Sequence, residues 1–247
     1  MWPPGLSWSS LAQAMNALDL KVLHLLNGFV NHWPRFDDLV VFIADAHLVK
    51  GGVIALLLWW AWFSQVPRAR DKVLCGLMGG FLALAIARVM AHLLPFRIRP
   101  VVDPTLDLHR APGLYDALVE HWGSAFPSDH AALFVPLCVA LWVISRPVGA
   151  FALAHTLVII LLPRVYLGLH RPSDLLGGAA VGILAFTAVW VWPTRDRVVR
   201  ALLGWERRRP AFFYPLLFLF IFELTEVFLS FRFGLALLRR LLGLSAG

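Results

Sequence analysis

Long apolar windows alternate with short polar segments along the whole chain. The windows run over about 39–63, 73–94, 128–145, 148–168, 174–192 and 211–231. A helix needs about 20 predominantly apolar residues to cross the hydrocarbon core of a bilayer, and each window approaches or exceeds that length. The pattern predicts an all-α polytopic membrane protein with six transmembrane helices.

The segment before the first window has a different pattern. It lacks the basic start and the continuous apolar core of a signal peptide. An apolar stripe at helical spacing predicts an amphipathic helix that lies in the membrane interface or packs against the bundle by the same face, and the pattern favours neither. The stripe consists of Leu11, Met15, Leu18, Val22, Leu25 and Phe29.

The chain shows no internal repeat and no low-complexity segment, so a single domain over 1–247 is predicted. Within it we expect an interfacial helix at 1–35, a core of five spans at 36–192, and a basic linker with the sixth span at 193–247.

Composition supports the membrane class. Hydrophobic residues make up 60% of the chain, charged residues 15%, and the mean hydropathy is +0.73. The net charge of +7 comes from residues in loops between windows, which favours contact with anionic lipids over nucleic-acid binding. Cys75 and Cys138 both fall in apolar windows, so no disulfide is expected.

Orientation follows from where Lys and Arg gather, because cytoplasmic loops carry an excess of them. A plain count is equal on the two sides. One dense cluster lies beside span ends and is assigned to the cytoplasm: Arg195, Arg197, Arg200, Arg207, Arg208 and Arg209. The longest polar break, over about 95–126, and the loop after the fourth window then face outward.

Three polar clusters fall at that outward face. They are "HLLPFRIRP" after the second window, "FPSDHA" at the start of the third, and "RVYLGLHRPSD" between the fourth and the fifth. Arginine guanidinium groups and the N-terminus of a helix bind phosphate oxygens, and a histidine ring oriented by a carboxylate can act as a nucleophile. Together the side chains of these clusters suit the binding and cleavage of a phosphate ester or anhydride. They are Arg99, Ser128, His130, Arg164, His170 and Asp174.

The three clusters resemble the signature motifs of the type 2 phosphatidic acid phosphatase superfamily, K-x6-R-P, P-S-G-H and S-R-x5-H-x3-D. The motifs span residues 92 to 174, and the six-helix layout extends the resemblance over most of the chain. The resemblance implies that His170 attacks phosphorus and forms a phosphohistidine, that Asp174 holds and polarises its ring, and that His130 protonates the leaving oxygen and later activates water.

The resemblance also implies that Arg99, Arg164 and Ser128 bind the phosphoryl oxygens. No metal or other cofactor is then required, because the arginines supply the positive field.

Three positions depart from the family pattern. His92 stands in the lysine position of the first motif, so Arg88, one helical turn earlier, or Arg97 is a candidate for the missing cation. Pro163 replaces the serine of the third motif, which has little consequence. Asp129 replaces the glycine of the second motif and is taken with His92 as a phosphate-binding candidate.

The variant P-S-D-H resembles the undecaprenyl pyrophosphate phosphatase branch of that superfamily. It implies hydrolysis of undecaprenyl diphosphate at the outer face of a bacterial plasma membrane, with Asp129, Arg97, Arg110 and Arg171 near the second phosphate. Lipid A, phosphatidylglycerophosphate, phosphatidate and other polyprenyl phosphates remain alternative substrates.

Two other functions are open to the same residues. A phosphotransferase would pass the phosphoryl group to a lipid acceptor in place of water. A carrier without chemistry is disfavoured, because carriers show inverted repeats and polar groups near the midplane. The sequence does not determine the oligomeric state; the expected partners are membrane lipids and a lipid phosphate substrate.

Charged residues inside the other windows are interpreted as structural. Asp45, His47 and Lys50 interrupt the first window, and Glu223 and Glu226 lie in the last. Charges within spans usually face the bundle and pair, so an ion pair of Lys50 or Arg88 with one of these glutamates is favoured over a role in substrate entry. His155 is interpreted as a packing residue.

Overall fold

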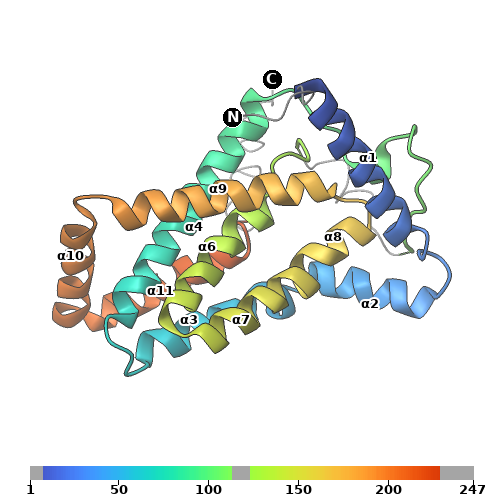
Figure 1. The fold of residues 1–247 in the computed structure, drawn as a ribbon. Helices are drawn as coiled ribbons and strands as arrows, with labels where there is room; N and C mark the ends of the chain where they lie inside the picture. The colour runs from blue at the N-terminus through green and yellow to red at the C-terminus, as the bar shows by residue number, and fades with distance from the viewer. Residues whose placement is uncertain (1–7, 113–122, 229–247) are drawn as a thin grey trace, which may run out of the picture.

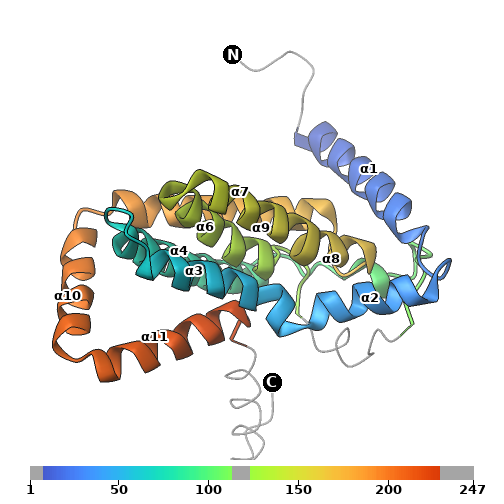
Figure 2. The same ribbon diagram turned by 90° about the horizontal axis from the view of Figure 1, so that it is seen from below.

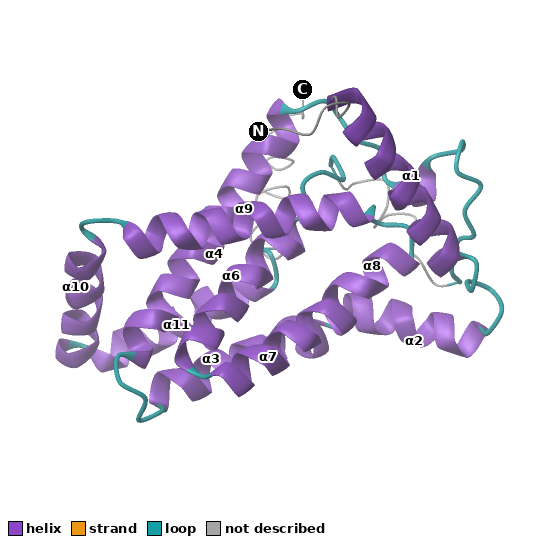
Figure 3. Ribbon diagram, in the orientation of Figure 1, coloured by secondary structure: helices purple, strands orange, loops and turns teal. Residues whose placement is uncertain are grey.

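A computed structural model describes residues 8–112 and 123–228, and over these residues the chain is helical without strands (Figures 1 and 3). The elements are α1 (Trp8–Asn27), α2 (Pro34–Asp45), η1 (Leu48–Gly52), α3 (Val53–Phe63), α4 (Ala69–Leu93), η2 (Pro100–Val102), α6 (Asp129–Ile144), α7 (Arg146–His155), η3 (Thr156–Leu161), α8 (Leu162–Tyr166), α9 (Pro172–Val191), α10 (Arg195–Arg208) and α11 (Pro210–Thr225).

Helices α4, α6 and α9 pack against one another more extensively than any other elements and form the centre of the fold. Small residues allow α9 to approach α6 closely. A Cβ at Gly178 would lie 2.4 Å from the carbonyl oxygen of Ser128, and one at Gly182 would lie 2.7 Å from that of Ala132. Glycine at these two positions therefore sets the distance between the N-terminal halves of α6 and α9, where two of the polar clusters lie.

The predicted windows coincide with helices, but not all of these helices are long enough to cross a membrane. Ala69–Leu93, Arg146–Tyr166 and Pro172–Val191 meet the length and hydropathy of a span, whereas Asp129–Ile144 and Pro210–Thr225 are shorter. The described residues thus contain three candidate spans, or up to four if a bent pair counts as one. Six crossings remain a prediction.

The first predicted span is a broken helix and not a continuous one. Pro34–Asp45 and Leu48–Phe63 meet at an angle of 62°, with the π-helical turn η1 at the start of the second part. Asp45, His47 and Lys50 all lie at this break. A π-helical turn with charged residues accounts for the polar interruption of the window.

The N-terminal helix packs on α8 and α9. Asp19, Leu23 and Asn27 form its buried face. Leu18 and Leu25 of the predicted apolar stripe are 59% and 66% exposed, so this part of the stripe points away from the bundle. The outward stripe is compatible with membrane contact, and a location in the interface remains a prediction.

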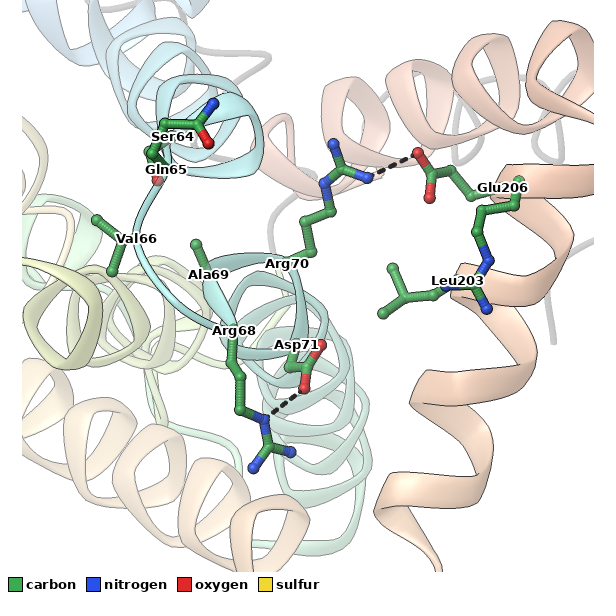
Figure 4. Close-up of a pocket in the computed structure, with 10 residues that line it drawn as sticks. Ser64, Gln65, Val66, Arg68, Ala69, Arg70, Asp71, Leu203 and Glu206 are labelled. Atoms are coloured by element: carbon green, nitrogen blue, oxygen red, sulfur yellow. Dashed lines mark hydrogen bonds and ion pairs between the residues drawn. The ribbon is translucent and has the colours of Figure 1, made fainter.

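The predicted basic linker forms α10, which leads into α11 at the end of the molecule opposite α1 (Figures 1 and 2). A cavity of about 340 Å³ lies beside it, where α4 begins (Figure 4). Four of the charged residues that line it form ion pairs: Arg70 Nη1 lies 2.9 Å from Glu206 Oε1, and Arg68 Nε lies 2.8 Å from Asp71 Oδ2. None of the three polar clusters contributes to this cavity.

Candidate active site

Backbone hydrogen bonds hold the three polar clusters together. The Ala125 N–H donates to the Arg97 carbonyl at 2.8 Å, which joins the second cluster to the first. The Ser128 N–H donates to the Asp174 carbonyl at 3.0 Å, which joins the second to the third. The Val101 N–H donates to the Gly168 carbonyl at 2.8 Å and closes the ring of contacts. Three segments far apart in the sequence thus form one site.

The imidazole of His170 is buried at the centre, with 5% of the residue exposed. Its Nδ1 lies 2.9 Å from the carbonyl oxygen of Ala125. A carbonyl oxygen only accepts, so Nδ1 carries the proton in the neutral ring and Nε2 keeps its lone pair. Nε2 faces Nη1 of Arg99 at 3.4 Å. His170 is therefore held in the tautomer whose Nε2 lone pair points at the Arg99 guanidinium, where Nη1 donates to it; an incoming phosphate would have to take over this donor.

Burial lowers the pKa of His170 below its usual value of 6.5, because the charged ring is poorly solvated. The guanidinium groups of Arg99 and Arg164 lower this pKa further, whereas the Asp174 carboxylate opposes them. A lowered pKa keeps the ring neutral at pH 7, which a nucleophile requires.

Asp174 is completely buried at the third position of α9. Arg97 Nη1 donates to its Oδ1 at 2.6 Å, and the Arg171 N–H donates to its Oδ2 at 2.7 Å. Its Oδ2 is 3.8 Å from His170 Nδ1, beyond hydrogen-bond length. The resemblance implied that Asp174 holds the ring; here the Ala125 carbonyl holds it directly, and the carboxylate acts through its charge.

Two guanidinium groups are buried beside His170. Arg99 is 9% exposed and Arg164 3% exposed. Arg99 Nη1 donates to the Leu169 carbonyl at 3.0 Å, and Arg164 Nη1 donates to the Ile160 carbonyl. The two positive charges act on each other. Like charges in a poorly solvated site repel, so the arrangement favours a bound anion.

The hydroxyl of Ser128 is buried at the N-cap of α6 and has no hydrogen-bond partner among the described residues. A buried hydroxyl without a partner is costly, and an N-terminal helix end attracts anions. This hydroxyl is thus a donor available to a phosphate oxygen.

His130 lies half-buried in the first turn of α6, where its ring stacks on Phe134 at 6.3 Å between centroids. The cations that act on it include Arg164, Lys50 and Arg88. The neighbouring Asp129 pairs with Arg88 of α4, with 2.6 Å between Oδ2 and Nη2. Asp129 and Arg88 therefore lie beside His130 as an ion pair.

The other candidates for the missing cation of the first motif lie in different surroundings. His92 is exposed in the last turn of α4, and no described residue forms a hydrogen bond or ion pair with it. Arg97 is bound to Asp174 and also lies over the ring of Phe126. Of the two alternatives to His92, Arg88 is the one that reaches the N-terminal turn of α6, next to His130.

The N-terminal helix contributes residues that the sequence did not identify. Asp19 accepts from the Ser173 N–H at 2.8 Å and from the Ser173 hydroxyl at 2.5 Å, and it lies 3.3 Å from Arg97 Nη2. Asn27 donates to the His109 carbonyl at 2.9 Å. The spacing of Asp19, Leu23 and Asn27, each four residues apart, is the signal that could have revealed this inward face.

An apolar cavity of about 290 Å³ opens beside Arg88, between α4 and the residues that follow α11. It is lined by Phe81, Leu84, Ala85, Arg88, Val227 and Phe228. Its apolar walls match the chemistry of a hydrocarbon chain, and Arg88, which pairs with Asp129, lies at its edge.

The family model of the PAP2 superfamily matches residues 95–197. This range contains the site residues from Arg97 to Asp174 and leaves out Arg88 and His92.

Three bacterial proteins are similar over most of their length. "Putative undecaprenyl-diphosphatase YbjG" of Escherichia coli (strain K12) is 28% identical over 193 residues, 77% of this chain and 91% of that protein. "Undecaprenyl-diphosphatase BcrC" of Bacillus subtilis (strain 168) is 24% identical over 168 residues, 68% of this chain and 80% of that protein. "Bacitracin transport permease protein BcrC" of Bacillus licheniformis is 22% identical over 200 residues, 78% of this chain and 90% of that protein. No solved structure matches the chain.

Proposed function

We propose that this chain is a membrane lipid phosphatase that hydrolyses undecaprenyl diphosphate to undecaprenyl phosphate and phosphate. The PAP2 superfamily match at residues 95–197 supports the phosphatase class. Two of its relatives are named as undecaprenyl-diphosphatases. The observation that carries the mechanism is the fixed tautomer of His170, whose Nε2 faces Arg99 in a buried site.

In the first step, Nε2 of His170 attacks the terminal phosphorus. The N–P bond forms, the bridging P–O bond breaks, and its electron pair leaves with the lipid phosphate. His130 donates a proton to the leaving oxygen. In the second step, His130 takes a proton from water, the hydroxide attacks phosphorus, and the N–P bond breaks to regenerate His170.

Arg99, Arg164 and the Ser128 hydroxyl bind the oxygens of the transferred phosphoryl group. Charge on these oxygens is stabilised best by donors that are already in place, and burial of both arginines strengthens the effect. The described residues contain no group of three or more His, Cys, Asp or Glu placed to hold a metal ion. Because the two arginines supply the positive charge at the phosphoryl oxygens in this scheme, we expect turnover to be independent of divalent metal.

The test is phosphate release by the purified full-length protein in detergent with excess EDTA. The panel comprises undecaprenyl diphosphate, undecaprenyl phosphate, phosphatidate, phosphatidylglycerophosphate and lipid A. We expect undecaprenyl diphosphate to give the highest kcat/KM, with rates unchanged by EDTA. Loss of activity in EDTA that added Mg²⁺ restores would contradict the metal-independent mechanism, and preference for another lipid would reassign the substrate.

We place the site on the outer side of a bacterial plasma membrane, because the basic helix α10 lies at the opposite end of the molecule (Figure 1). Gly123→Cys beside the site and Arg200→Cys on α10 test this placement. Both positions are exposed, and a Cβ at Gly123 meets no atom within 4 Å. In intact cells a membrane-impermeant maleimide should label the first variant and spare the second. If only the Arg200→Cys variant were labelled, the site would face the cytoplasm instead.

A further inference from the structure

The break in the first predicted span buries a lysine. Lys50 lies in the π-helical turn η1 and is 6% exposed. The chain is packed tightly here, since a Cβ at Gly51 would lie 2.8 Å from the carbonyl oxygen of Thr225. π-Helical turns inside helices frequently occur at functional sites. A buried ammonium group in such a turn calls for a partner of opposite charge.

A second π-helical turn lies next to the first. η1 packs on η3, the π-helical turn just before Arg164, and His155 Nε2 lies 3.0 Å from the Val49 carbonyl oxygen. Figures 1 and 2 both show the α2–α3 segment running alongside α7 and α8. Arg164 acts on Lys50 as a like charge, and Lys50 in turn acts on His130. Lys50 therefore belongs to the electrostatic surroundings of the candidate active site.

The ion pair expected for Lys50 leaves most of its hydrogen-bonding capacity unused. Lys50 Nζ is 3.8 Å from Glu226 Oε2, and this carboxylate also contacts Nδ1 of His47. The described residues accept no hydrogen bond from Nζ, although an ammonium group has three donors. Arg164 acts on Lys50 as a like charge, and the Asp45 carboxylate acts on both cations. An anion bound by both would further reduce this repulsion.

We propose that Lys50 binds the phosphate that stays on the lipid when a diphosphate substrate is cleaved. This inference rests on the proposed function. In the proposed reaction His130 protonates the leaving oxygen, and that oxygen belongs to the inner phosphate. Lys50 lies in η1, which packs on η3, and its charge acts on His130, so we assign it to the leaving-group side. As the bridging P–O bond breaks, Lys50 donates hydrogen bonds to the oxygens that gain negative charge and transfers no proton.

Two of the three arginines considered from the sequence for this second phosphate, Arg97 and Arg171, are engaged elsewhere. Arg97 is bound by Asp174 and Asp19. Arg171 donates to the Ile98 carbonyl at 2.9 Å and to Asp103 Oδ2 at 3.2 Å. Within 8–112 and 123–228, the nearest carboxylate contact of Lys50 is the 3.8 Å approach to Glu226.

The experiment compares a diphosphate with a monophosphate of the same lipid. A monophosphate has no inner phosphate, so Lys50 has nothing to bind when it is cleaved. We expect Lys50→Met to lower kcat/KM for undecaprenyl diphosphate about 10- to 100-fold and for undecaprenyl phosphate by less than about threefold. Lys50→Arg should keep most of the diphosphate activity. Glu226→Gln, the matched control, should retain both activities.

A structural ion pair gives a different pattern. Equal loss on both substrates, or a Glu226→Gln variant that reproduces Lys50→Met, would overturn the proposal. Because Lys50→Met removes the lysine partner of Glu226 and leaves it only the contact with His47, the double variant Lys50→Met/Glu226→Gln is tested as well and must show the same selective loss.

Binding separates this inference from the proposed function. Thermal stabilisation of the full-length protein by inorganic pyrophosphate and by phosphate is measured without turnover. The wild type should bind pyrophosphate more tightly, and Lys50→Met should remove the difference. If the wild type binds both equally, the role of Lys50 is refuted; if it binds as expected but hydrolyses no lipid, the proposed function alone fails.

Discussion

Replacement of His170 by alanine is expected to lower phosphate release from undecaprenyl diphosphate at least about 1,000-fold, to the background of the assay. The side chain supplies the only nucleophile in the proposed first step, and Nε2 is the ring atom that faces Arg99. The measurement is kcat of the purified variant, with a melting curve to show that it is folded. His24→Ala, an exposed histidine on α1, is the matched control and should keep wild-type activity.

The same step predicts a trapped intermediate. If His130 activates the water of the second step, the His130→Ala protein should accumulate the phosphohistidine. Mixed with undecaprenyl diphosphate labelled in its terminal phosphate, it should retain label in a bond to histidine that acid cleaves and base does not. A His170→Ala/His130→Ala protein should retain none. Near-wild-type turnover by His170→Ala would refute the assignment of the nucleophile, whatever the intermediate shows.

Helix positions could be predicted because apolar residues mark the segments that avoid water. The window at 73–94 became α4 (Ala69–Leu93), and the window at 174–192 became α9 (Pro172–Val191). The break at η1 was not predicted, because mean hydropathy over a window hides a local change of helix type. Asp45, His47 and Lys50 were visible there, but their sequence positions do not show which neighbours they meet.

The site could be predicted as a set of residue types and only partly as a geometry. The motifs identified His170 and Asp174, but the group that fixes the ring is the main-chain carbonyl of Ala125, which any residue would supply. Likewise, Asp19 holds the first turn of α9 from the other end of the chain. Such contacts depend on tertiary packing, and the spacing of residues in the sequence does not show which distant segments meet.

The second large effect concerns Arg99. Arg99→Gln is expected to lower kcat/KM about 100-fold or more, because a donor to the phosphoryl oxygens is lost from a buried site. It should also move the acidic limb of the pH–rate curve. His170 attacks only when neutral, so kcat/KM falls as the pH drops through the pKa of His170, which burial and the two arginines hold below 6.5 in the wild type.

The direction of this shift is set by charge. The Arg99 cation lowers the pKa of His170, so Arg99→Gln should raise this pKa and move the acidic limb to higher pH. The Asp174 anion raises the same pKa, so Asp174→Asn should lower it and move the limb to lower pH. A phosphate substrate also titrates near pH 6, but it does so equally for all three proteins and cancels in the comparison. The measurement is kcat/KM between pH 4.5 and 8 for the wild type and both variants. Shifts in the same direction for the two variants would mean that general loosening of the site, and not the field of Arg99 and Asp174 at His170, governs its protonation.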